Sequence, residues 1–174
     1  MAAFAVIPFI STALVANGGV RQAQLPVVFV SGGLLTLLST PLAGRLVDRF
    51  GAYPVLRGVV PLSAAMMLVV TQLPAVGVAG AAVVIAVLMA TNSSRMVTAM
   101  SLITSSIEPR RRGSFMSVNS SVQHVASGLG AMLGGLIIDG GAGEPLRHFG
   151  TVGIVAAAVT IASLWVAARI RPVA

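Results

Sequence analysis

The segment Gly44–Gly51 is a dense group of charged residues and glycines between two long apolar runs of this chain. It reads Gly-Arg-Leu-Val-Asp-Arg-Phe-Gly and places Asp48 between Arg45 and Arg49. An exposed acid beside a base can form a local ion pair, worth about 0 to 1 kcal/mol. The segment therefore predicts reversible charge pairing, and its plainest interpretation is a solvated turn between two apolar elements.

A second group of polar residues lies within the apolar stretch 113–138. Asn119 and Gln123 are four residues apart and share one face of a helix, and His124 is adjacent to that face. Polar groups are costly in lipid, so they should face protein or a water-filled cavity. Two interpretations are open, namely hydrogen bonds between helices, worth about 0.6 kcal/mol each, or the wall of a substrate cavity. A lone histidine more often packs than carries protons, so we include His124 only as a cavity candidate.

A third group is the pair Asn92 and Arg95, which ends an otherwise apolar run. Arg95 can extend its charged end toward the membrane surface along an apolar stem. It can also line a cavity together with Asn92, or pair with Asp48 or Glu108. A charge inside a membrane span is a functional candidate by default.

Several kinds of chemistry are excluded or unsupported. The chain has no cysteine, so disulfides, zinc thiolate sites and thiol catalysis are excluded. We find no metal-ligand cluster, phosphate-binding loop or Ser-His-Asp set in the sequence, and we expect neither a cofactor, nor a metal, nor an enzyme activity. No acid is predicted in the middle of a span, so a proton-coupled mechanism would need its coupling acid elsewhere.

The elements that position these residues must be membrane helices. Of the 174 residues, 56% are hydrophobic and only 9% are charged, against about 25% charged residues in a typical soluble domain. The net charge of +7 comes from arginine alone. Because the arginines separate apolar runs and aromatic residues are few, we expect a lipid bilayer rather than a nucleic acid as the partner.

We predict an all-α integral membrane bundle with six transmembrane helices in one domain, residues 1–174. Residues 1–72 and 77–170 would form two three-helix repeats of inverted topology. A weak echo of Gly44–Gly51 in residues 138–150 agrees with such a repeat. The six predicted spans are 2–16, 25–43, 55–71, 77–89 with a polar extension to 103, 113–138 and 150–168.

The distribution of arginine predicts the orientation in the membrane. Nine arginines fall on one side of the predicted spans and two, Arg21 and Arg147, on the other. The positive-inside rule places the nine in the cytoplasm, together with both chain ends. We therefore expect a multi-pass protein of the cell (inner) membrane with cytoplasmic termini.

The run from Pro41 to Gly51 resembles the signature loop of the major facilitator superfamily, with a glycine, an Asp-Arg pair and a second glycine between two spans. Arg57 meets the later basic position of that pattern, whereas Ala52-Tyr53-Pro54 departs from it. Other segments resemble later helices of drug and sugar exporters in this family: 6–10 with 24–26, 92–96, 109–116 and 119–123. The resemblance covers the whole chain but corresponds to the second half of a twelve-helix transporter.

The resemblance implies a conformational latch. Asp48 would sit at the N-terminus of a helix in the opposite six-helix half, where the helix dipole favours an anion. The matching helix in this chain starts behind Arg110, Arg111 and Arg112, near Gly113. The implied latch loop comprises Gly44, Arg45, Asp48, Arg49, Gly51 and Arg57.

The resemblance also implies a function. We expect transport of small molecules, with efflux as the direction, by alternating access against a second six-helix half. That half is a missing N-terminal portion, with which the uncharged start at Met1 agrees, or a second copy in a parallel homodimer. The alternative is a membrane interaction protein or degenerate half-transporter that moves no substrate.

Overall fold

The computed structural model describes residues 6–138 and 148–169, and this part of the chain is helical, with no strand. Six α-helices follow one another, with short 3-10 turns η2 (Ile7–Phe9), η3 (Gln22–Gln24) and η4 (Pro109–Arg111) before three of them. The all-α prediction is confirmed. The helices are α1 (Ile10–Ala16), α2 (Leu25–Phe50), α3 (Ala52–Thr71), α4 (Gly77–Ser105), α5 (Arg112–Ile137) and α6 (Phe149–Ala167).

The prediction that Gly44–Gly51 is a turn is wrong. Gly44 to Phe50 form the last two turns of α2, and only Gly51 separates α2 from α3. Arginine and leucine are good helix formers, so a high charge density does not end a helix. The break comes from Gly51, whose φ of 88° is a backbone conformation that favours glycine. Pro54 follows in the first turn of α3, where its missing N–H costs no helical hydrogen bond.

Four helices are long and apolar enough to cross a membrane: α2 extended to Gln22, α3, α4 and α6. The prediction of six spans is thus confirmed for four of them. The described part of the first span, Ile7–Ala16, is shorter than a span requires. Helix α5 has 26 residues, about 39 Å, but its serines, Asn119, Gln123 and His124 lower its apolar character. Residues 139–147, which hold much of the predicted echo, lie outside the described residues.

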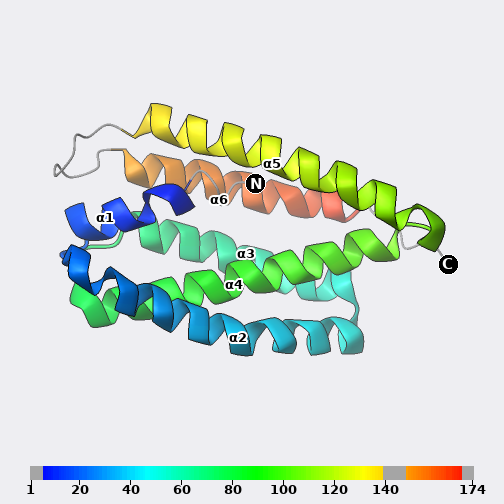
Figure 1. Cartoon of the computed structure of the whole chain (residues 1–174), viewed down its shortest axis with the longest axis horizontal. Helices are drawn as coiled ribbons and strands as arrows, with labels where there is room; N and C mark the ends of the chain where they lie inside the picture. Colours follow the sequence, from blue (N-terminus) through cyan, green and yellow to red (C-terminus); the bar gives the residue numbers. More distant parts are fainter. Residues whose placement is uncertain (1–5, 139–147, 170–174) are drawn as a thin grey trace.

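The helices pack in a chain of neighbours rather than around one axis. Helix α2 packs along α4, α4 along α3, and α3 along α6, while α5 contacts mainly α6 (Figure 1). Two glycines make the closest crossings. A side chain at Gly32 would collide with Met89 across the α2–α4 contact, and one at Gly153 would collide with Thr71 across the α3–α6 contact. The relation between the two proposed three-helix repeats stays a prediction.

Two apolar cores lie toward opposite ends of this bundle. The larger one joins α1, the first half of α2, the end of α3, the start of α4 and the start of α6, and includes Ile10, Met67 and Phe149. The smaller one joins the start of α3 to the ends of α4 and α6, through Leu56, Leu102 and Ala167 among others. The second core stands at the arginine-rich end of the bundle, where α2 also ends (Figure 1).

Candidate functional site

The predicted latch residues lie on the exposed end of α2 and the start of α3. Arg45, Asp48, Arg49 and Arg57 are all exposed. Among the described residues Asp48 has no ion-pair partner, and the Arg49 guanidinium instead lies 5.3 Å from the centre of the Phe50 ring. The Asp48 carboxylate is therefore available to a partner outside this part of the chain.

The two latch glycines differ in what they do within this chain. A side chain on Gly44 would meet nothing within 4 Å, so no neighbouring helix of the described structure requires a glycine there. Gly51 is required by the backbone, because it makes the one-residue break between α2 and α3. The flank of α2 at Gly44 is thus left open to approach from outside.

The predicted partner region of the latch begins α5. Arg110, Arg111 and Arg112 are exposed, and a side chain on Gly113 would also meet open space. The Arg111 Nε atom lies 3.7 Å from Glu108 Oε2, but both side chains are largely exposed, so this pair stabilises little. The C-terminus of α2 and the N-terminus of α5 lie at the same end of the bundle but on opposite sides of it (Figure 1). The described structure brings Asp48 into no ion pair with this region.

The polar face of α5 is largely uncovered. Gly134 is the only buried residue of this helix, Asn119 and Gln123 are half-buried, and His124 is exposed. The Nδ2 atom of Asn119 is buried without a hydrogen-bond partner in the described residues. A helix long enough to cross a bilayer therefore has hydroxyl and imidazole groups, at Ser120, Ser121 and His124, that the described residues leave exposed.

The structure separates the predicted cavity residues. Asn92 lines a cavity of about 320 Å³, here called the central cavity, whereas Arg95 lines a different pocket of about 420 Å³, here called the arginine pocket. Residues of α5 line neither of them. The Arg95 Nη2 atom nevertheless donates a 2.8 Å hydrogen bond to Asn92 Oδ1, so the two residues are joined across α4. Arg95 is therefore bonded to Asn92. Among the described residues it pairs with neither Asp48 nor Glu108, the two acids considered for it.

The central cavity is apolar with a few polar groups. It lies between the α1 region, α2, α3 and α4, and none of its lining side chains is charged. Thr36, whose Oγ1 is buried without a partner in the described structure, and Ser93 join Asn92 as its polar residues. A cavity of this size and character is typical of small-molecule sites.

Sequence reasoning missed Thr36, Ser93 and the apolar residue Phe29, which line this cavity. The hydroxyl residues of α2 are the feature of the sequence that could have indicated which side of α2 faces α4. Ser31 donates to the Ala82 carbonyl at 3.3 Å and Ser39 to the Ala90 carbonyl at 3.5 Å. Thr40 bonds Ser93 at 2.9 Å. These residues mark the face of α2 that packs on α4 and so fix which side chains flank the cavity.

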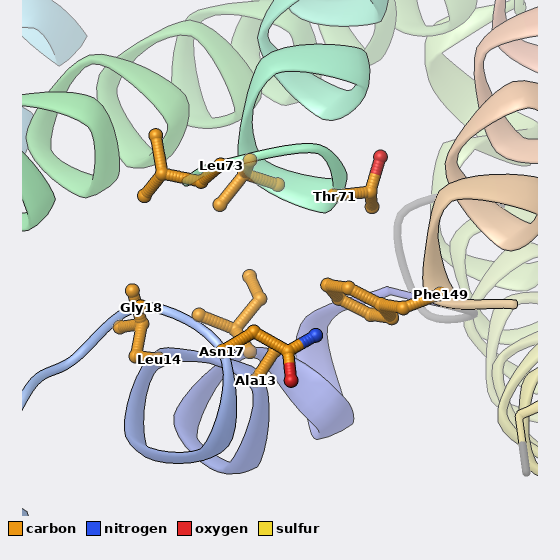
Figure 2. A pocket seen from close by; sticks show the side chains of 9 residues that line it. Ala13, Leu14, Asn17, Gly18, Thr71, Leu73 and Phe149 are labelled. Carbon is orange, nitrogen blue, oxygen red and sulfur yellow. The ribbon is translucent and has the colours of Figure 1, made fainter. Parts of the chain in front are cut away.

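The opposite end of the bundle is closed. Phe149, which is 3% exposed, projects toward α1 beneath the end of α3, close to Asn17 and Thr71 (Figure 2). The pocket left between these residues holds about 10 Å³, at the lower limit for a single water molecule. Apolar packing thus fills the space between α1, α3 and α6, and the gap left there is too small for a substrate.

Comparison with known families identifies the chain. The model of the Major Facilitator Superfamily matches residues 1–174. The chain belongs to the major facilitator superfamily. Members of this family are membrane transporters of small molecules and not enzymes, which agrees with the apolar helices found here. Neither the curated proteins nor the solved structures give a significant match.

Proposed function

We propose that this major facilitator protein exports small, mainly apolar and uncharged molecules across the cell (inner) membrane by alternating access, as one half of a transporter. The uncovered polar face of α5 carries this proposal. A helix of about 39 Å whose Ser120, Ser121 and His124 are exposed is not stable against lipid alone. It becomes reasonable when a second six-helix half, or water between the halves, covers that face.

Helix α2 supports the same arrangement from the other side of the bundle. Only four of its residues are buried, and Leu37 and Leu38 are 70% and 71% exposed. With α5 it provides two flanks for a second half, and the halves would rock about the substrate. The second half is an N-terminal six-helix portion or a second copy of this chain.

The substrate class is inferred from the residues that line the central cavity. Its lining carries no charge, so it favours molecules with an apolar body and one or two hydrogen-bonding groups that Asn92, Ser93 or Thr36 can meet. The latch is assigned to the arginine-rich end, where Asp48 would meet the start of the partner's α5, near Arg112. Both termini would lie in the cytoplasm with this end.

The test is flux by the chain alone in reconstituted vesicles loaded with fluorescent apolar compounds. Concentration-dependent export, together with a disulfide-linked dimer of the double variant Leu46→Cys/Phe115→Cys, would support a homodimer. These positions are exposed near the two latch elements, and the natural chain has no cysteine to interfere. Absence of both flux and dimer would remove the homodimer. If flux stays absent when a candidate N-terminal half is co-reconstituted, the non-transporting alternative replaces the proposal.

A further inference from the structure

The arginine pocket lies outside the central cavity, between the start of α3 and the C-terminal halves of α4 and α6. Its volume is about 420 Å³, and most of its walls are aliphatic: Leu56, Val60, Ala99, Leu102, Ile103, Val166 and Ala167. Ser163 is its other polar lining residue, and the Ser163 hydroxyl is already bonded to the Thr160 carbonyl at 2.6 Å. Arg95 is therefore the one lining side chain of this pocket with free hydrogen-bond donors.

Arg95 enters this pocket with an unsatisfied charge. It lies ten residues before the end of α4, about 15 Å along the helix axis. Its Nη2 atom bonds Asn92, but its Nε atom is buried without a partner in the described structure. Neither described acid pairs with it, because Glu108 lies against Arg111 and Asp48 has no ion-pair partner in this part of the chain.

A neutral amide does not neutralise a guanidinium. A cation held among aliphatic side chains inside a span is costly unless an anion meets it. The planar guanidinium has N–H donors beyond the one that bonds Asn92, and a pair of such donors suits an oxyanion with two oxygens. The aliphatic walls beside it suit an apolar chain, and the volume is that of a single small molecule rather than a two-chain lipid.

We propose that the arginine pocket binds an amphipathic organic monoanion, a free acid with one carboxylate and an apolar tail. The carboxylate meets Arg95, and the tail lies along Val60, Ala99 and Leu102. The site is distinct from the central cavity, so it requires neither transport nor a second half. The carboxylate neutralises the positive charge of Arg95, which the neutral amide of Asn92 does not.

The test measures binding rather than flux. The purified full chain in phosphatidylcholine nanodiscs is titrated with laurate that carries an isotope label at its carboxyl carbon. Binding to empty nanodiscs is subtracted. Dodecanol, which has the same tail without the charge, serves as the matched ligand. We expect laurate to bind at least about tenfold more tightly than dodecanol, because a hydrogen bond to a charged group is lost with the alcohol.

Variants distinguish the contribution of the Arg95 charge from that of the pocket volume. Arg95→Gln should weaken laurate binding at least about tenfold, and Arg95→Lys should restore most of it. Ala99→Leu fills the pocket while keeping the cation, so it should also weaken binding, and it keeps the test valid if Arg95→Gln does not fold. Arg21→Gln removes an equal charge from an exposed site near the start of α2 and should bind laurate like the natural chain.

Three results would overturn the proposal. The first is equal affinity for laurate and dodecanol. The second is unchanged laurate binding in both Arg95→Gln and Ala99→Leu. The third is displacement of laurate by phosphatidylglycerol added to the nanodisc, which would make a membrane phospholipid, rather than a free acid, the natural occupant.

Discussion

The two ends of this bundle are built in opposite ways. At one end Phe149 fills the space between α1, α3 and α6 and leaves a pocket of about 10 Å³. At the other end the same helix α6 and the start of α3 diverge around Arg95 and leave about 420 Å³. At one end apolar packing fills the space between α1, α3 and α6, whereas the other end holds charge, open space and the Asp48 carboxylate, which has no ion-pair partner among the described residues.

This difference indicates a division of labour within one six-helix unit. Tight packing gives the closed end a single arrangement, because apolar contacts of this density do not deform gradually. The arginine-rich end has the smaller apolar core and carries exposed charged groups, such as Asp48 and the arginines of η4 and α5. The proposed function accordingly assigns stability to the closed end, and binding and movement to the open end.

Phe149→Ala should have the largest effect on stability. Removing a buried phenylalanine leaves a cavity and costs about 3 to 5 kcal/mol. The matched control is Phe115→Ala, because Phe115 is 41% exposed at the open end. Thermal unfolding in detergent should show a much larger fall in Tm for Phe149→Ala, and equal falls would contradict the contrast between the ends.

Gly153→Val should have the second-largest effect on stability. The new side chain would collide with Thr71 and force α3 and α6 apart, at a cost of about 1 to 3 kcal/mol. Gly58→Val places the same residue on α3 where nothing lies within 4 Å. The same unfolding assay should separate the two variants, and a Gly58→Val protein as unstable as Gly153→Val would show that helix propensity, rather than the crossing, decides the result.

Thr40→Val should have a small effect. It removes the 2.9 Å hydrogen bond to Ser93 between α2 and α4, and such bonds are worth about 0.6 kcal/mol in membranes. Thr104→Val is the control, since the Thr104 hydroxyl bonds the Met100 carbonyl of its own helix. A loss of several kcal/mol on Thr40→Val would mean that the middle of the bundle depends on polar contacts rather than on apolar packing.

The helices were largely predictable from the sequence, because long apolar runs and their breaks follow from hydropathy alone. The end of α2 was not predictable from the sequence. Its last two turns carry Arg45, Asp48 and Arg49, which are compatible with a helix, and the break depends on the backbone of a single residue, Gly51. Charge density did not mark the end of the helix.

The site was less predictable than the helices. Asn92 and Arg95 are three residues apart and were assigned to one cavity, but they line different pockets. Three helical steps rotate a side chain by about 60° from its predecessor, and the neighbours differ on the two sides. Helix α2 lies beside Asn92 and helix α6 beside Arg95. Which helix stands opposite a residue is set by packing and not by the local sequence.

Flux by the Asp48→Asn variant tests the central claim most directly, once export by the natural protein has been established in vesicles. The substitution keeps the size of an exposed side chain and removes its charge, so Tm should stay unchanged while export falls at least about tenfold. Glu108→Gln, which removes an exposed acid at the same end, should export normally. Wild-type export by Asp48→Asn, with the protein folded, would contradict the assignment of the arginine-rich end as the moving end.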